Sequence, residues 1–288
     1  WGYASSRQRD PCTSKRLKIY SNCMSECYYY EHLNLPSGSL DPSIDHLYIL
    51  TMHESPRIKD IKDQAKRSGI VSNVTIQYNY GYKKCDKNLD EQKTNLDLVH
   101  ALQTVFRHAL SKGYERIMVL EDDCQFDERI HDPEVIDDLN SFLIKRDPPV
   151  YSLGGFGMFV NPIDVLLHNR NQLSLLLGAS HCIVYNRKHM EHAAYKKFIT
   201  GHVDAELRHT FFKYTYHKPL AYQVFEDTEN SLEWGSWKKL FEYTLYPLFP
   251  VNKSVQPGFD NSKIFFDYVM VFICVFISFK IIRACITK

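Results

Sequence analysis

The sequence predicts a doubly wound α/β domain with a mainly parallel sheet, helices on both faces, and a separate hydrophobic helix at its C-terminal end. Two observations carry this prediction. Short apolar runs typical of buried strands alternate with longer stretches of helical periodicity, which is the pattern of βαβ units. Residues 264–286 then form an apolar run that is long enough to cross a bilayer as a helix.

The chain divides into four parts by composition. Residues 1–43 are polar and rich in Tyr and Cys, and we expect them to form a loosely packed N-terminal extension. The alternating pattern occupies residues 44–250 and predicts the main domain. Residues 251–263 are expected to be a linker, and residues 264–286 a transmembrane helix.

Composition indicates a folded domain and gives no sign of nucleic-acid binding. The chain has 288 residues, 44% of them hydrophobic, which is enough for a sizeable core. Its 35 basic and 34 acidic residues give a net charge of +1, without the basic excess of nucleic-acid-binding domains. We therefore expect no nucleic-acid partner. The eight cysteines show no zinc-site spacing, and both an N-terminal disulfide and free thiols remain open.

The first half of the domain shows clear element boundaries. Residues 47–52 are apolar and predict a strand. Ser55 and Pro56 follow as an N-cap and a first helical residue, and Gly69 ends that helix. Residues 74–80 then predict a second strand.

The next unit is the clearest in the chain. Thr94 and Asp97 resemble a capping box at the start of a helix with a regular apolar face, which Gly113 closes. Residues 117–120 predict a short buried strand. A further helix begins at Asp132-Pro133, and the strand predicted at 150–153 runs into a glycine pair.

Three consecutive acids follow the strand at 117–120, namely Glu121, Asp122 and Asp123. Loops at the carboxyl ends of strands carry the ligands in open α/β sheets. Three carboxylates in such a loop repel one another unless a cation holds them, and Mg²⁺ or Mn²⁺ typically joins carboxylates to substrate phosphates. The acids therefore predict a metal–diphosphate site, with a solvated acidic turn as the alternative.

The order of these segments resembles the glycosyltransferase family 25 group, which includes lipooligosaccharide and procollagen galactosyltransferases. The resemblance covers about residues 46–232. It is carried by Leu47-Tyr-Ile-Leu-Thr-Met, by Leu120-Glu-Asp-Asp-Cys-Gln-Phe, and by Gly178-Ala-Ser-His-Cys-Ile-Val-Tyr-Asn-Arg-Lys. The chain departs from the family at Thr51-Met52, where Asn-Leu is usual, and at Ala101-Leu102, where the family has Ser-His.

The resemblance implies a GT-A fold, a nucleotide-sugar donor, and Mn²⁺ or Mg²⁺. We assign Glu121 and Asp123 to the metal. A late histidine often completes such sites; the candidates are His181, His202 and His217, and we assign His217. The residues assigned to the nucleotide sugar are Thr51, Arg57, Asp122, Gly154 and Gly155.

Asp204 is our candidate for the general base that inverting transfer requires, and an N-cap role is its alternative. The predicted function is metal-dependent transfer of a hexose, galactose or glucose, from a UDP-sugar to a hydroxyl of a glycan or glycoprotein. A magnesium-dependent phosphotransferase or hydrolase and a non-catalytic, membrane-anchored sugar-binding protein are the alternatives. The absence of a GxxxxGK[ST] motif counts against the first.

The hydrophobic helix predicts a membrane-anchored protein of an endomembrane or of a viral or host membrane. Lys280, Arg283 and Lys288 would place its C-terminal end on the cytoplasmic side by the positive-inside rule. The domain would then lie in a lumen. A tail anchor with a cytosolic domain is the competing topology, and the sequence leaves the choice open.

Overall fold

The fold is known from a computed structural model, which describes residues 27–154, 156–178, 180–197, 203, 207, 210–223 and 258–286. The elements in the first half are β1 (Tyr28–Asn34), β2 (His46–Met52), α2 (Ile58–Ser68), β3 (Asn73–Asn79), α3 (Thr94–Ser111), β4 (Arg116–Glu121), β5 (Cys124–Phe126), the 3₁₀ turn η2 (Glu128–His131) and α4 (Pro133–Arg146). Those that follow are β6 (Val150–Ser152), β7 (Phe156–Val160), α5 (Pro162–Leu166), β8 (Asn171–Gly178), β9 (Cys182–Asn186), α6 (Arg187–Ala193), β10 (Lys213–Tyr216), β11 (Ala221–Gln223) and α11 (Gly258–Ile286).

Within these residues, nine strands form one sheet in the order β1-β3-β2-β4-β9-β6-β10-β8-β7, and β5 pairs with β11 in a small second sheet. In the large sheet β2 runs parallel to β3 and β4, and β10 runs parallel to β6. The other pairings are antiparallel. The prediction of a mainly parallel sheet is therefore corrected to a mixed sheet.

The second half of the chain explains this difference. Parallel neighbours need a long crossover, whereas β7 and β8 are joined only by the five-residue helix α5 and its flanking turns. Strand β9 follows β8 after a short turn and runs antiparallel to both β4 and β6. Apolar periodicity identifies such strands but carries no information about their direction.

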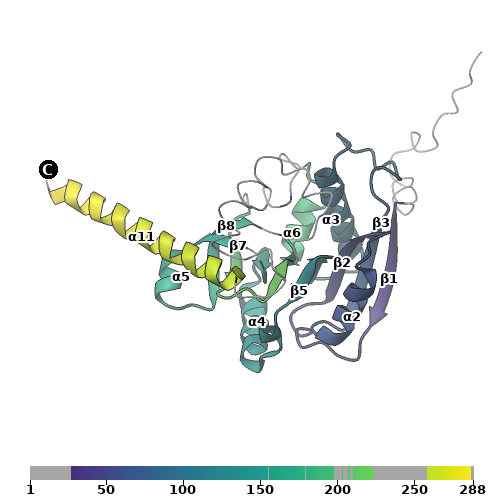
Figure 1. The fold of residues 1–288 in the computed structure, drawn as a ribbon, viewed down its shortest axis with the longest axis horizontal. Helices are drawn as coiled ribbons and strands as arrows, with labels where there is room; N and C mark the ends of the chain where they lie inside the picture. The colour runs from purple at the N-terminus through teal and green to yellow at the C-terminus, as the bar shows by residue number, and fades with distance from the viewer. Residues whose placement is uncertain are drawn as a thin grey trace, which may run out of the picture.

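Helices cover both faces of the sheet, as predicted (Figure 1). Successive residues of β4 alternate between two cores, with Met118 facing α2 and α4 and Val119 facing α3 and α6. Both side chains are at most 3% exposed. The period of two in the strand and the apolar stripes of the helices thus produce a three-layer arrangement.

The described sheet begins before residue 44, inside the segment expected to be a loose extension. Residues Tyr28–Asn34 form β1, which pairs antiparallel with β3 along its whole length. Cys27 forms a disulfide with Cys85 in the loop between β3 and α3. The edge strand is therefore tied to the domain both by hydrogen bonds and by a covalent link.

Two predicted helix starts lie elsewhere in the structure. Helix α2 begins at Ile58, three residues after the predicted cap. The Ser55 hydroxyl donates to Asp122 at 2.8 Å, and its oxygen accepts from the backbone N–H of Arg57 at 3.3 Å. The N-cap residue of α3 is Lys93, and Asp97 bonds to a lysine of the preceding loop. Gly69 ends α2 in the left-handed conformation, with φ of 55°, which confirms the predicted stop.

His46 is a buried titratable residue at the start of β2. Its side chain is 6% exposed, and its Nε2 lies 2.6 Å from Thr75 Oγ1. Burial lowers the pKa of His46 to about 3, assisted by the nearby rings of His108 and His32. The fold therefore holds this ring in its neutral form.

Acid should destabilise the fold through His46. The pKa of His46 is lower in the folded state than in the unfolded state. The stability that neutral His46 contributes is therefore fully present above the unfolded pKa near 6.5, and it is lost as the pH falls toward 3. In His46→Gln, the unfolding free energy lost between pH 7 and pH 5 should be smaller than in the wild type by about 2 kcal/mol. Urea denaturation in detergent at both values measures this. The exposed His131→Gln is the control, and an unchanged pH dependence in His46→Gln would contradict the expectation.

Candidate functional site

The three acids lie at the topological switch point of the sheet. The chain leaves β2, passes through α2 to β3 on one side, and returns through α3 to β4 on the other side. Leu50 of β2 pairs with Glu121 of β4, so the ends of these two parallel strands lie level. Open α/β sheets bind ligands in the crevice that this reversal leaves.

Asp122 is held by the segment that follows β2. Its Oδ2 accepts hydrogen bonds from Thr51 Oγ1 at 2.7 Å and from Ser55 Oγ at 2.8 Å. Arg57 Nη2 lies 3.5 Å from its Oδ1. The structure thus brings together three of the residues assigned to the nucleotide sugar, namely Thr51, Arg57 and Asp122. The contact of Ser55 was missed, because its position before a proline indicated only a helix cap.

Asp123 differs from Asp122 in having one carboxylate oxygen without a hydrogen-bond partner among the described residues. Its Oδ2 accepts from Gln223 Nε2 at 2.6 Å, and the pairing of β11 with β5 holds Gln223 there. Its Oδ1 is buried and has no hydrogen-bond partner among the described residues. Burial raises the pKa of Asp123 to about 6, and the negative charge of Asp122 adds to this. A buried carboxylate oxygen in this condition is stabilised by a cation.

Glu121 points to a different partner. Its Oε1 accepts from Ser180 Oγ at 2.7 Å, and its backbone N–H donates to the carbonyl of His181 at 3.0 Å. Glu121 and Asp123 are alternate residues, but the hydrogen bonds described here take them to different segments, 180–181 and β11 respectively.

The structure does not place His217 with the acids. Its backbone N–H donates to the carbonyl of Arg170 at 2.7 Å, and the centre of its ring lies 4.7 Å from that of the Tyr216 ring. Burial lowers the pKa of His217 to about 4, and the charges of Lys218 and Lys263 add to this. Among the described residues there is also no group of three His, Cys, Asp or Glu side chains arranged around one metal position.

His181 is the histidine that the structure places next to the acidic turn. Its side chain is 1% exposed, and Nε2 lies 3.4 Å from the carbonyl of Ala221. Burial lowers the pKa of His181 to about 4, so its ring is neutral at physiological pH. A Cβ on Gly154 would lie 2.3 Å from His181 Nε2. Gly154 is therefore needed for close packing against this ring. Gly155 and Asp204 lie outside the described residues.

A cavity opens beside the acids, between α2 and the turn that follows β4. Its volume is about 490 Å³, which is within the range of small-molecule sites. Both signs of charge line it. The charged and titratable residues on its wall include Arg57, Asp60, Arg67, Asp122, Asp123 and His131.

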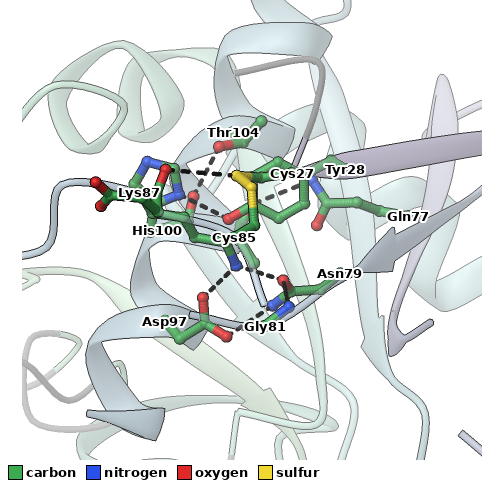
Figure 2. Close-up of polar contacts among 12 residues, drawn as sticks. Cys27, Tyr28, Gln77, Asn79, Gly81, Cys85, Lys87, Asp97, His100 and Thr104 are labelled. Atoms are coloured by element: carbon green, nitrogen blue, oxygen red, sulfur yellow. Dashed lines mark hydrogen bonds and ion pairs between the residues drawn. A yellow bond between two sulfur atoms is a disulfide. The ribbon is translucent and has the colours of Figure 1, made fainter. Parts of the chain in front are cut away.

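A buried polar cluster supports the neighbouring edge of the sheet, at the end of β3. Lys87 donates to Asp97 and to Asn79, and Asn79 Nδ2 donates to Asp97 Oδ2 at 3.1 Å (Figure 2). The ammonium of Lys87 lies 4.6 Å from the centre of the Tyr28 ring. The Cys27–Cys85 disulfide lies beside the cluster and closes the loop that carries Lys87. Sequence reasoning missed this cluster, since Lys87 stands among polar loop residues.

Comparison with known proteins gives little further information. No family model and no curated protein matches the sequence. Among solved structures, the chain is similar to that described as "Crystal Structure of A197 from STIV", with 14% identity and a TM-score of 0.38. The match covers 63% of this chain and 86% of that chain. A likeness at this level carries no argument about function.

Proposed function

We propose that the chain is a metal-dependent, membrane-anchored glycosyltransferase, which moves a hexose from a UDP-sugar to a hydroxyl of a glycan or glycoprotein. One observation carries the proposal. The buried carboxylate of Asp123 has an oxygen that finds no hydrogen-bond partner among the described residues, at the switch point of an α/β sheet and on the wall of a cavity of about 490 Å³.

The donor set fits a hard divalent cation. Mg²⁺ and Mn²⁺ prefer oxygen ligands, and one or two carboxylates suffice when substrate phosphates complete the coordination. Asp123 Oδ1 would be the direct protein ligand. The oxygens of Asp122 already accept from Thr51 and Ser55 and face Arg57, so Asp122 is better suited to positioning. A bound cation would stabilise the negative charge that the departing diphosphate gains.

The same cavity supplies positive charge for a diphosphate. Arg57 and Arg67 both line it, and guanidinium groups bind phosphate oxygens in pairs. The carboxylate of Asp122 holds Arg57 beside Asp123. This combination of carboxylates and two arginines suits a metal–diphosphate complex better than a free anion. Galactose and glucose are the hexoses that we propose first.

We also propose a membrane anchor with the domain in an oxidising compartment. Helix α11 contains a span of 27 residues with a mean hydropathy of 2.4, long and apolar enough to cross a membrane. The Cys27–Cys85 disulfide supports a lumenal or extracellular domain, because such bonds are rare in the cytosol. The cations Lys280 and Arg283, near the far end of α11, then agree with a cytoplasmic C-terminal end.

A donor screen tests the proposed activity. Full-length protein purified in detergent should release UDP from UDP-galactose or UDP-glucose with Mn²⁺, and not in the presence of EDTA. Release of UMP and hexose 1-phosphate in place of UDP would show cleavage within the diphosphate and would favour a hydrolase or phosphotransferase instead. If no UDP-sugar yields UDP with either Mn²⁺ or Mg²⁺, the transferase proposal fails.

A further inference from the structure

Helix α5 carries an exposed apolar stripe. Ile163 and Leu166 on the helix and Leu167 at its C-cap are 60%, 61% and 67% exposed. The helix is held firmly in place: Asn161 caps it by accepting from the N–H of Ile163 at 3.2 Å, and Asp164 accepts from Leu173 N–H at 2.9 Å. The stripe is thus presented by a fixed element and is not a product of a loose end.

The first turns of α11 are docked on the domain. Asp260 pairs with Arg129 through both carboxylate oxygens, at 2.8 and 3.1 Å. Lys263 is 3% exposed and donates to Asp267 and to Gln172 of β8. The helix therefore starts at Gly258, inside the expected linker, and leaves the domain in a fixed direction (Figure 1).

The apolar part of α11 begins where the docked part ends. Tyr268 follows the buried Asp267 directly and is 67% exposed. From Tyr268 to Phe279 the chain has 12 residues without a charge. At the helical rise this run spans about 18 Å, so crossing the roughly 30 Å of a bilayer core also needs residues 280–286, whose two cations can reach the headgroups by snorkelling. Residues that flank a short span are drawn toward the membrane. No part of this run is therefore left as a spacer between the domain and the membrane surface.

The stripe of α5 lies beside the docked part of α11, at the level where the membrane surface would meet the domain. Helix α5 lies against α11, as Figure 1 also shows, and ring contacts between Phe159 and Phe266 join α11 to neighbouring β7. We propose that α5 is an interfacial membrane element, with Ile163, Leu166 and Leu167 inserted at the boundary between lipid headgroups and acyl chains. This proposal rests on the membrane anchor proposed above. Exposed apolar side chains in that position are buried by lipid, as in interfacial helices.

Quenching of tryptophan fluorescence by brominated lipid tests the insertion. Leu166→Trp places a reporter on α5 at an exposed position, so the fold should tolerate it. Ile144→Trp, at a 51% exposed site on α4, is the matched control, and Phe276→Trp reports on α11 itself. Each full-length variant is reconstituted in phosphatidylcholine vesicles and in vesicles of dibrominated phosphatidylcholine. The three native tryptophans are subtracted as a common background.

The added emission of Leu166→Trp should fall at least about twofold in brominated vesicles, as for Phe276→Trp, whereas that of Ile144→Trp should be unchanged. If Phe276→Trp is quenched and Leu166→Trp is not, the interfacial role of α5 is overturned and the anchor stands. If Phe276→Trp is not quenched either, the anchor fails and this inference fails with it. UDP release by the same preparations reports separately on the transferase activity.

Discussion

Asp123→Asn should lower the rate of metal-dependent UDP release by about 10²–10³-fold, the size of effect seen when one group that stabilises developing charge is removed. The substitution keeps the shape of the side chain and an oxygen for the hydrogen bond from Gln223. It removes the negative charge at the only carboxylate of the described acidic turn that has a buried oxygen without a hydrogen-bond partner. Initial rates at saturating Mn²⁺ and UDP-sugar measure the effect.

Two controls separate this effect from misfolding. Glu128→Gln removes a carboxylate from the wall of the same cavity at an exposed position, and it should change the rate less than about twofold. The melting temperature of Asp123→Asn should not fall, because the raised pKa of Asp123 shows that the fold disfavours its charged form. Wild-type activity in Asp123→Asn would remove this residue from the mechanism.

Lys87→Met should lower the free energy of unfolding by about 3–5 kcal/mol, the cost of leaving a buried charge without its partner. The side chain of Lys87 is fully buried, and its partner Asp97 is 5% exposed. The loss should loosen the loop that the Cys27–Cys85 disulfide closes and the end of β3 beside the site. Chemical denaturation of the full chain in detergent measures the change.

Lys59→Met makes the same substitution in an exposed pair. Lys59 and Asp63 lie 2.9 Å apart with side chains 86% and 42% exposed, so Lys59→Met should lower the free energy of unfolding far less than Lys87→Met does. Adding Asp97→Asn to Lys87→Met removes the stranded charge and should restore part of the lost stability. Equal losses of unfolding free energy in Lys87→Met and Lys59→Met would show that the buried cluster does not stabilise the fold.

Local signals in the sequence predicted much of the fold. The short apolar run 117–120 became β4, the glycine at position 69 became the left-handed end of α2, and helices cover both sheet faces. Strand direction could not be predicted in the second half. Short apolar runs such as those of β8 and β9 pair equally well in either direction until the connections between them are known.

The site was predicted in part. The position of Asp122 and Asp123 follows from a strand that ends in acids. Thr51 and Arg57, which the family resemblance assigns to the nucleotide sugar, contact Asp122 in the structure. Which histidine adjoins the acids depends on antiparallel pairing between β4 and β9, and that pairing places His181 there.

Other contacts involve residues too far apart in sequence for any local pattern. Cys27 and Cys85 are 58 residues apart, and with eight cysteines their pairing could not be deduced from spacing. Asp97 has the sequence context of a helix cap, yet its partner is a buried lysine ten residues earlier. Tertiary packing decided these contacts, and local propensity did not.

The most direct test of the proposed metal–diphosphate site is the shift in melting temperature caused by UDP, measured with and without Mn²⁺ in the wild type and in Asp123→Asn. A ligand that binds only the folded state at 100 times its Kd stabilises it by about 2.7 kcal/mol, which is readily detected. We predict that UDP raises the melting temperature of the wild type only with Mn²⁺, and that Asp123→Asn shows no such rise. A rise of equal size without metal, or in Asp123→Asn, would contradict the central claim.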